Sequence, residues 1–444
     1  MDSYDEEIDS ADNSVSRRRL FRHGAAVAGG ALAAQVARGQ AAAPAKSGKS
    51  LAGTKFRAMV RHDTALTIEE LTLRPIQPQQ VVIRTQAAQA CYTIVSVLNN
   101  NPVRNAVIVG HGGVGIVEEV GPEVTRVQVG DRVILAVTPQ CGQCWLCLRG
   151  RGDLCCSGAD RPVLPVADMR DRTPVNGDIG GYAELMVQWE EYIVPIFSEV
   201  SAEELSLLSC VSACGLGMAL KRAPVEPGSD VVVFGAGPVG LSAVQGARIA
   251  GAAQIIAVEP IKYRRELALK VGATTVLDPN VDRGNDLVTK IKGLCKGPAV
   301  RAFAGGRGNN ANWGPMFVLE AVGGDRFPPK VEAGPDPTGL EVLQQVWQVC
   351  PPGGVIRTCG VGQPRGTNLS FPANQWSNAG KTHMPGNLGG VNPLHDVPMF
   401  VRLIEGKEFD AKSLVTAIFP LDRAREALQA AADRTTVTGI VTFG

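Results

Sequence analysis

Long uninterrupted apolar runs are missing from the 444 residues of this sequence. No stretch reaches the roughly 18 consecutive apolar residues that a membrane-spanning helix requires, so we expect a soluble mature protein without membrane insertion. A basic run with interleaved aromatic residues is also missing, and 44 lysine and arginine residues nearly balance 43 aspartate and glutamate residues. These absences exclude a protein that reads the phosphate backbone of a nucleic acid.

The cysteine content is too low and too uneven for a disulfide scaffold. Such scaffolds are short, cysteine-dense chains, whereas here eleven cysteines are spread over a long chain and four of them fall within residues 141–155. The length and the 45% share of hydrophobic residues fit a globular protein with two or three domains. The 51 glycines and 29 prolines predict many tight turns.

The first fifty residues differ in composition from the rest of the chain. An acidic start leads to SRRRLFR at 16–22 and then to a small, weakly apolar stretch without acidic residues. Arg17 and Arg18 match a twin-arginine export signal, and Ala41 and Ala43 match its cleavage site. We therefore predict export by the twin-arginine machinery to the periplasm or the extracellular space, with a cytoplasmic location if the signal is not used. A disordered tail with a chance arginine triplet is the alternative.

Two kinds of pattern follow one another along the rest of the chain. Short alternating strands are predicted at 56–73, 79–90, 115–121 and 131–139. After Ser212 the pattern changes to strand, helix and strand, which predicts an α/β fold with a parallel sheet covered by helices on both faces. A helix over 419–433 and a last strand over 438–444 close the chain. Two glycine- and proline-rich runs, 301–316 and 324–339, predict loops or insertions.

A glycine-rich turn follows the predicted strand over 230–234. Gly235, Gly237 and Gly240 form a G-x-G-x-x-G pattern, in which glycines permit a tight turn, close approach of a diphosphate and packing of the helix on the strand. Glu259 ends the next strand, where a carboxylate accepts hydrogen bonds from both adenosine ribose hydroxyls and repels a 2′-phosphate. The pattern predicts binding of NAD rather than NADP; a turn without a ligand is the alternative.

Four cysteines lie close together in one loop. Cys141, Cys144, Cys147 and Cys155 supply the four thiolates of a closed tetrahedral zinc site, which stabilises a fold and leaves no position for a substrate. Chance spacing or disulfides are the alternative. Metal-assisted chemistry needs three protein ligands and an open fourth position. The candidates for those three ligands are Cys91, His111 and Cys210.

Several motifs together resemble the zinc-dependent medium-chain alcohol dehydrogenases. They are CYT at 91–93, GHGGVGIVEEVG at 110–121, the four-cysteine loop, LLSCVSACGLGMAL at 207–220 and VVVFGAGPVGLS at 231–242, in that family's order. The resemblance implies a GroES-like β-rich catalytic domain and a Rossmann doubly wound parallel sheet. The predicted division is an N-terminal signal at 1–50, the catalytic domain at 51–211, the NAD-binding domain at 212–382, and a C-terminal segment at 383–444 that completes the catalytic domain.

The resemblance also implies residue roles. Cys91, His111 and Cys210 are expected to hold a catalytic zinc that acts as a Lewis acid on the substrate oxygen, while hydride passes between the alcohol carbon and NAD. Thr93 is expected to take the alcohol proton, unless it is a strand-end threonine bonded to backbone. The remaining implied contacts are with the cofactor: Cys214, Cys359, Gly360 and Val361 around the nicotinamide, Val239 beneath it, and Arg264 at the adenosine ribose.

Five positions depart from the family pattern. Ser96 replaces a histidine that relays the proton outward, and Ile94 replaces an aspartate. Gly112 replaces a glutamate that follows the ligand histidine, and losses of this kind commonly lower metal affinity or activity about 10–100-fold. Tyr92 and Thr438 stand where some members have arginines, the first of them on the diphosphate. The contacts to the cofactor are therefore expected to differ in part.

These observations predict a zinc- and NAD-dependent alcohol or aldehyde oxidoreductase. We expect two zinc ions per chain, a small-molecule substrate, and a homodimer or homotetramer. Two alternatives stay open. In the first alternative, the protein is a nicotinoprotein that keeps NAD permanently bound and uses a second substrate or external electron acceptor. In the second, it is an exported zinc- or ligand-binding relative that has lost catalysis.

Overall fold

The computed structural model describes residues 49–295 and 314–444. The predicted export signal, except residues 49 and 50, and most of the predicted loop at 301–316 lie outside the described residues. The described residues belong to one compact unit, residues 45–444.

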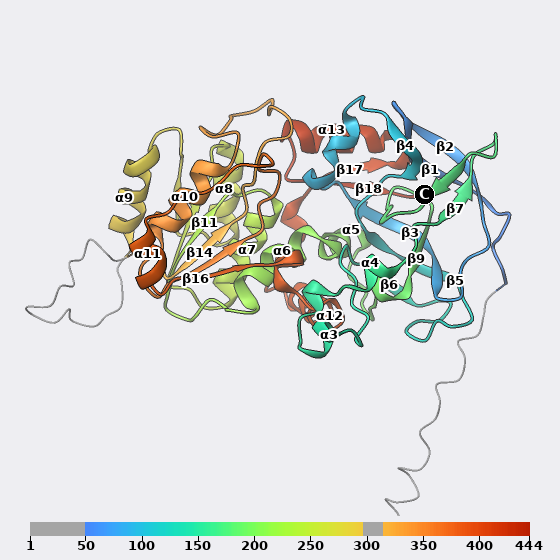
Figure 1. Cartoon of the computed structure of the whole chain (residues 1–444), viewed down its shortest axis with the longest axis horizontal. Coiled ribbons are helices and arrows are strands. Elements are labelled where there is room, and N and C mark those ends of the chain that lie inside the picture. The colour runs from blue at the N-terminus through green and yellow to red at the C-terminus, as the bar shows by residue number, and fades with distance from the viewer. Residues whose placement is uncertain (1–48, 296–313) are drawn as a thin grey trace, which may run out of the picture. The chain divides into compact units, whose positions relative to one another are not determined.

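Two β-sheets form the part that precedes residue 200 (Figure 1). Successive side chains of a strand point to opposite faces, so Phe56, Ala58 and Val60 lie together inside a closed barrel. The barrel has the order β1-β2-β7-β8-β4, with β1 (Lys55–Asp63), β2 (Ala65–Leu73), β4 (Val103–Ile108), β7 (Pro165–Asp168) and β8 (Pro174–Asn176). A seven-stranded sheet has the order β10-β6-β5-β3-β18-β17, with β9 also paired to β3. Its N-terminal strands are β3 (Gln80–Gln89), β5 (Gly113–Val120), β6 (Arg132–Leu135), β9 (Leu185–Trp189) and β10 (Ile193–Pro195).

The C-terminal segment returns to this sheet. Strand β18 (Thr438–Thr442) pairs antiparallel with β3, with Ile440 opposite Gln89, and β17 (Val415–Pro420) lies beside β18. Helix α13 (Ala424–Asp433) packs on the short helix η1 (Tyr92–Leu98). The end of the chain thereby comes to lie next to the segment that carries Cys91.

A six-stranded parallel sheet forms the second half of the chain. Its order is β13-β12-β11-β14-β15-β16, and every pairing in it is parallel. The strands are β11 (Asp230–Phe234), β12 (Gln254–Val258), β13 (Thr275–Leu277), β14 (Phe317–Glu320), β15 (Val355–Thr358) and β16 (Thr382–Pro385). The order reverses between β11 and β14, as in a doubly wound nucleotide-binding sheet. The predicted fold class is confirmed.

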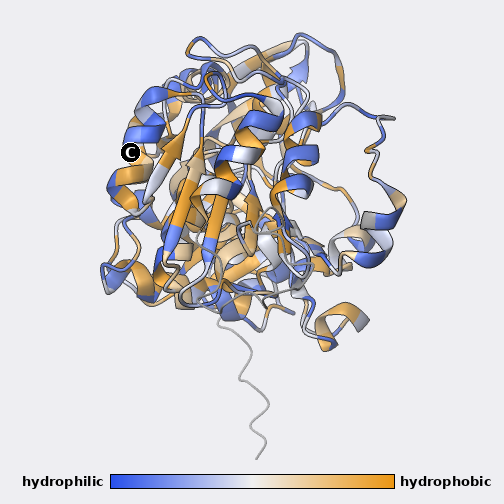
Figure 2. Cartoon of the chain, turned by 90° about the vertical axis from the view of Figure 1, so that its left-hand side faces the viewer, coloured by the Kyte–Doolittle hydropathy of each residue, from blue (hydrophilic) through white to orange (hydrophobic). Residues whose placement is uncertain are grey.

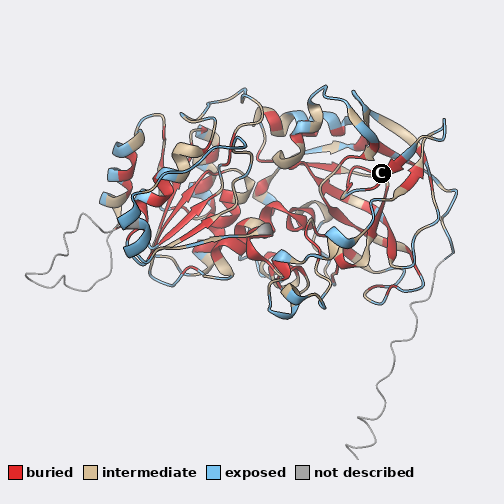
Figure 3. Cartoon of the chain, in the orientation of Figure 1, coloured by how far each residue is buried: buried red, intermediate tan, exposed pale blue. Residues whose placement is uncertain are grey.

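Helices cover both faces of the parallel sheet (Figure 2). Strands buried on both faces read as continuous apolar runs, and β11 and β14 are buried along their whole length (Figure 3). The helices in this part are α7 (Pro238–Ile249), α8 (Lys262–Val271), α9 (Gly284–Leu294), α10 (Leu340–Val349) and α11 (Ala373–Asn378). The predicted loop at 324–339 contains neither helix nor strand.

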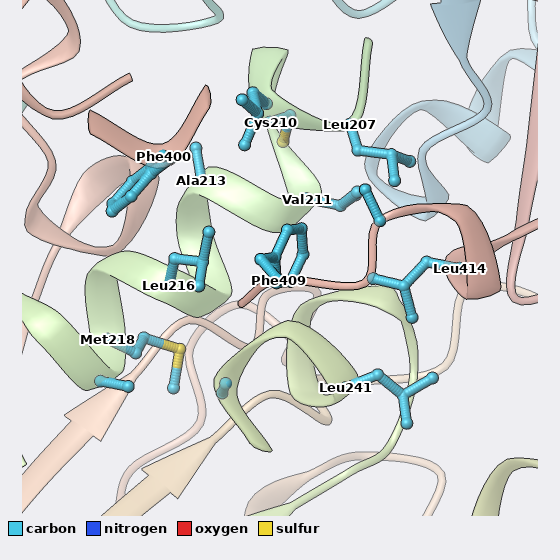
Figure 4. Packing of buried hydrophobic residues seen from close by; sticks show 14 of the residues in the cluster. Leu207, Cys210, Val211, Ala213, Leu216, Met218, Leu241, Phe400, Phe409 and Leu414 are labelled. Carbon is cyan, nitrogen blue, oxygen red and sulfur yellow. The ribbon is translucent and has the colours of Figure 1, made fainter. Parts of the chain in front are cut away.

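Helix α6 (Val211–Leu220) is buried in the largest hydrophobic cluster. Figure 4 shows its Val211 and Leu216 together with Phe409, Leu414 and Leu241, which come from the C-terminal segment and from α7. Cys210, which precedes α6, is therefore held by packing. The remaining helices are α3 (Trp145–Leu148), α4 (Ser157–Asp160), α5 (Ala202–Ser206), α12 (Pro393–Glu405), η2 (Gly152–Leu154), η3 (Glu190–Tyr192), η4 (Leu207–Ser209), η6 (Asn387–Gly390), η7 (Lys412–Leu414) and η8 (Leu421–Arg423).

Within residues 49–295 and 314–444, no single helix has both the length and the apolar composition of a membrane span. The bent pair Ala202–Ser209 and Val211–Leu220 meets those two criteria jointly.

Candidate active site

Cys91, His111 and Cys210 meet in space although they are far apart in the sequence. Cys91 lies between β3 and η1, His111 between β4 and β5, and Cys210 between η4 and α6. Their ligand atoms all lie within 4.8 Å of one another. Metal bonds of about 2.0–2.3 Å bring tetrahedral ligands to this range of separation. We call these residues the three-ligand cluster.

The donor set of the three-ligand cluster fits a cation. Hydrogen bonding to Cys210 and burial raise the pKa of the Cys91 thiol well above its ordinary value. Hydrogen bonding to Cys214 raises the pKa of the Cys210 thiol in the same way. Ionising these buried thiols therefore costs free energy. A divalent cation offsets that cost, because a thiol that coordinates one is deprotonated. Two thiolates and an imidazole are a donor set of catalytic zinc sites with one position left open, so these residues fit a zinc ion.

Thr93 and Gly112 lie next to ligands of the three-ligand cluster. The Cys91 thiol donates a hydrogen bond to Thr93 Oγ1 over 3.2 Å, so the predicted proton acceptor lies beside the cluster. Gly112 has a φ of +75°, and a Cβ there would lie 2.4 Å from the carbonyl oxygen of Leu135. A glutamate therefore does not fit this backbone without a shift. Ser209, which accepts a hydrogen bond from Gln89 Nε2, is the side chain nearest to that position.

Cys141, Cys144, Cys147 and Cys155 form a second group, the four-cysteine cluster. Their sulfur atoms also lie within 4.8 Å of one another. Backbone amides of Cys141, Cys144 and Cys147 donate to sulfur atoms of the same group over 3.2–3.4 Å. Bonding from the Cys147 amide lowers the pKa of the Cys144 thiol to about 6. Four sulfurs with amide donors fit a closed tetrahedral zinc site.

The loop of the four-cysteine cluster is fixed to the rest of the protein by one buried carboxylate. Asp153 is fully buried and forms ion pairs with Arg151 and Arg222, each at 2.8 Å. Arg222 follows α6, and Asn392 Oδ1 accepts a hydrogen bond from the Gly152 amide over 2.7 Å. The cluster therefore stabilises a loop that packs against the segments after α6 and η6.

A cleft begins at Cys91 and Thr93 and extends along the carboxyl edge of the parallel sheet. Gly240 packs so tightly that a Cβ there would lie 1.8 Å from the carbonyl oxygen of Gly235. Gly237 precedes α7, and no side chain caps the amides of the first helical turn. Free amides and the helix dipole at such a turn bind phosphate groups. The glycine-rich turn therefore fits the diphosphate of a dinucleotide, and we call this space the cofactor cleft.

Glu259 joins the glycine-rich turn to the next strand. Its Oε2 accepts a hydrogen bond from the Ala236 amide over 2.6 Å, and its Oε1 accepts one from the Ile261 amide over 3.0 Å. The carboxylate lines the cofactor cleft while it stays largely buried. Each oxygen keeps a second acceptor position, so the carboxylate fits two ribose hydroxyls.

Most of the predicted cofactor residues line the cofactor cleft. They are Gly235, Gly237, Val239, Glu259, Arg264, Cys359, Gly360 and Val361. Gly240 is not among the lining residues, because it packs α7 against the turn. Cys214 is not among them either; it lies within α6 and packs against the hydrophobic cluster that surrounds this helix. The individual roles of these residues stay predictions.

Comparison with known proteins agrees with this geometry. Residues 77–198 match the family described as alcohol dehydrogenase GroES-like domain, and residues 238–405 match the family described as zinc-binding dehydrogenase. Alcohol dehydrogenase 6 of Peromyscus maniculatus is 30% identical over 373 residues, which cover 82% of this chain and 91% of that protein. The chain belongs to the zinc-dependent alcohol dehydrogenase family.

Other members of this dehydrogenase family match over similar lengths. An NDMA-dependent alcohol dehydrogenase from Amycolatopsis methanolica is 28% identical over 400 residues, covering 87% of this chain and 98% of that protein. The crystal structure of benzyl alcohol dehydrogenase from Acinetobacter calcoaceticus has a TM-score of 0.72 and 28% identity, and it covers 88% of this chain and 100% of that chain.

One part of this family member was predicted only as an insertion. The loop at 324–339 follows β14 and crosses to the half of the protein that carries Cys91 and His111, which we call the catalytic half. There the amides of Arg326 and Phe327 donate hydrogen bonds to the Tyr92 hydroxyl over 2.9 and 3.2 Å. Lys330 forms an ion pair with Asp433 at the end of α13, with 2.8 Å between the charged atoms. The same loop contacts the half that contains the parallel sheet, which we call the nucleotide-binding half. Asn280 Nδ2 in that half donates a hydrogen bond to the carbonyl of Ala333 in the loop over 3.0 Å.

Sequence reasoning also missed a buried carboxyl group at the end of β14. Glu320 accepts hydrogen bonds from the amides of Val322, Gly323 and Gly360 over 2.7–3.1 Å. Burial raises the pKa of Glu320. The residue therefore joins the start of the loop at 324–339 to the segment after β15 in this dehydrogenase. Its place at the carboxyl end of a parallel strand, the functional edge of such sheets, was the available signal.

Proposed function

We propose that this member of the alcohol dehydrogenase family is a zinc-dependent oxidoreductase that transfers hydride between an alcohol or aldehyde and NAD. The observation that carries the proposal is the position of an open three-ligand cluster at one end of a dinucleotide cleft, since Cys91 and Thr93 line that cleft. When bound, zinc supplies a Lewis acid for the substrate oxygen and NAD supplies a hydride acceptor.

The protein's own residues have separable tasks in this reaction. Cys91, His111 and Cys210 would hold the ion, and Cys91 also lines the cleft. Thr93 Oγ1, 3.2 Å from the Cys91 sulfur, would accept the proton that leaves the alcohol while its own hydroxyl proton passes on toward solvent. Val239 and Val361 line the cleft and would give it an apolar wall beside the reacting carbon. The substrate thus meets one ion, one hydroxyl and an apolar wall.

Selection of NAD over NADP should depend on Glu259. We expect Glu259→Ala to lower the ratio of kcat/KM for NAD to that for NADP by about 10-fold or more, because the carboxylate repels a 2′-phosphate and bonds the ribose. The ratio is measured with both cofactors at saturating alcohol. Glu341→Ala, which removes another carboxylate that lines the cleft, is the matched control. An unchanged ratio in Glu259→Ala would show that another group makes this selection.

A second candidate function is favoured by the loop at 324–339. Its contacts with Tyr92, Asp433 and Asn280 connect both halves of the protein beside the cofactor cleft, and its Gly334, Pro335 and Asp336 form part of the cleft wall. Such a cover slows the exit of a dinucleotide. One relative carries the name NDMA-dependent alcohol dehydrogenase. A nicotinoprotein that keeps NAD bound and passes electrons to a second substrate is consistent with both observations.

We also propose that the protein is exported after folding. The proposal is supported by the Arg17-Arg18 motif, and all eleven cysteines lack disulfides, which suits thiols loaded with zinc before they meet an oxidising compartment. In a twin-arginine-competent host, the exported protein should have a mass that corresponds to cleavage after Ala43. A double Arg17→Lys, Arg18→Lys change should retain it in the cytoplasm, whereas Arg19→Lys should not. Export of the double variant would contradict the proposal.

The assembly is proposed from the resemblance alone. We propose a homodimer or a homotetramer in solution. Light scattering on the purified protein measures the mass directly, and a monomer at micromolar concentration would contradict this proposal.

A further inference from the structure

The cofactor cleft lacks two arginines that some members of the family have at the positions of Tyr92 and Thr438. Tyr92 is uncharged, and Thr438 is fully buried with no hydrogen-bond partner for its hydroxyl, so neither supplies a positive charge to the cofactor cleft. A dinucleotide carries two negative charges on its diphosphate. The structure therefore has to provide cationic groups from other positions if the proposed cofactor binds.

Arg434 supplies one such group from an unusual backbone position. It ends helix α13 with φ 59° and ψ 26°, the left-handed conformation that glycine adopts most readily at helix ends. Non-glycine residues in this conformation cluster at functional sites. The Arg434 guanidinium lies 5.3 Å from the centre of the Tyr92 ring and is ion-paired with Asp325 of the loop at 324–339. Tyr92 and Asp325 thereby hold the Arg434 side chain against the wall of the cofactor cleft.

Arg264 supplies a second cationic group from the nucleotide-binding half. Its Nη1 lies 3.7 Å from the position of a Cβ on Gly237, so the guanidinium faces the glycine-rich turn. Its Nε donates to the Tyr263 hydroxyl over 3.1 Å, and its Nη2 donates to the Thr436 carbonyl over 3.0 Å. These bonds fix the side chain and leave Nη1 directed at the place where a phosphate would approach.

We propose that Arg434 and Arg264 together bind the diphosphate of the dinucleotide, in place of the arginines missing at Tyr92 and Thr438. Arg264 is thereby assigned to the diphosphate rather than to the adenosine ribose, where the resemblance places it, because its Nη1 faces the glycine-rich turn. Two guanidinium groups and the amides at the start of α7 provide charge-assisted hydrogen bonds to phosphate oxygens. Asp325 neutralises part of this charge and connects Arg434 to the loop at 324–339. The contacts of that loop and the binding of the diphosphate are then coupled. The inference rests on the proposed function, because it concerns the same cofactor.

Arg434→Gly is the sharpest test, since glycine accepts the left-handed backbone and removes the side chain without strain. Two quantities are measured on the purified full chain: the exchange rate of bound NAD against isotopically labelled NAD, and the dissociation constants of ADP-ribose and adenosine. We expect exchange to accelerate and ADP-ribose affinity to fall by about 10–100-fold, the range for hydrogen bonds to charged groups. Adenosine affinity, which involves no phosphate, should not change, and Arg434→Lys should be intermediate.

Arg172→Gly provides the matched control. Arg172 is also left-handed, with a φ of 69°, but it is exposed and lies between β7 and β8, so the same change in charge and backbone should leave NAD exchange unaltered. Equal exchange rates in Arg434→Gly and Arg172→Gly would overturn the inference. An equal loss of adenosine affinity would also overturn it, because Arg434 would then shape the cleft as a whole. If the unaltered protein binds neither NAD nor ADP-ribose, the proposed function itself fails.

Discussion

Cys91→Ala is expected to lower kcat/KM for an alcohol by at least about 10³-fold while the chain stays folded. A Lewis acid contributes several kcal/mol of transition-state stabilisation, and each 1.36 kcal/mol is a factor of ten in rate. Cys91 is one of the three ligands whose donor atoms lie within 4.8 Å of one another. The rate is followed as NADH formation, or as reduction of an artificial acceptor if NAD is resident, and circular dichroism reports the fold.

Cys144→Ala should have a different effect. It removes one ligand of the four-cysteine cluster, so metal loss there should lower the free energy of unfolding directly and release the loop held by Asp153. Two cysteines outside both clusters serve as controls: Cys350, buried in the nucleotide-binding half, and Cys156, exposed beside the four-cysteine cluster. Full activity in Cys91→Ala would refute the catalytic assignment and favour a protein that binds ligands without turnover.

The second large effect concerns the cofactor. If NAD is resident, protein purified without added nucleotide and dialysed exhaustively should still contain NAD, and it should reduce an artificial acceptor with alcohol alone. Retention of this kind requires a dissociation constant well below micromolar, beyond about −8 kcal/mol. The structural reason is the loop at 324–339, which is joined to Tyr92 by two amide hydrogen bonds and to Asp433 by an ion pair.

A variant that weakens the attachment of the loop at 324–339 tests whether the loop retains NAD. Tyr92→Phe removes the hydroxyl that accepts from Arg326 and Phe327 and keeps the ring beneath Arg434. This change should increase the rate of NAD loss during dialysis without altering the zinc content. Protein that is free of NAD and turns over only when NAD is added would contradict the prediction that NAD stays bound. The protein would then be an ordinary dehydrogenase with exchangeable NAD.

Local patterns made much of the fold predictable. Strand β11, buried along its whole length, carries the apolar run 231–234 after Asp230 and is followed by glycines, because a strand covered on both faces has no polar side. The four-cysteine cluster was predictable for a similar reason, since its ligands are neighbours in one loop and their spacing is visible in the sequence. The parallel sheet followed from the alternation of strands and helices.

Contacts between distant segments were not predictable in this way. The three-ligand cluster joins residues from three separate segments, so no local spacing reveals it; residue type made Cys91, His111 and Cys210 candidates, and the resemblance supported the set. Arg434 resembles any surface arginine at a helix end; its role depends on a left-handed backbone and on Asp325, 109 positions earlier in the chain. The loop at 324–339 has no periodicity, and its binding to Tyr92 depends on the return of the C-terminal segment to β3.

Metal analysis combined with native and denaturing mass measurement tests the central claim most directly. Protein purified without chelators or added nucleotide should contain two zinc ions per chain. Cys91→Ala and Cys144→Ala should each retain about one, the first folded and inactive, the second active in proportion to the fraction that remains folded. A single zinc ion in the unaltered protein, or two in Cys91→Ala, would contradict the account of an open catalytic centre beside a closed structural one.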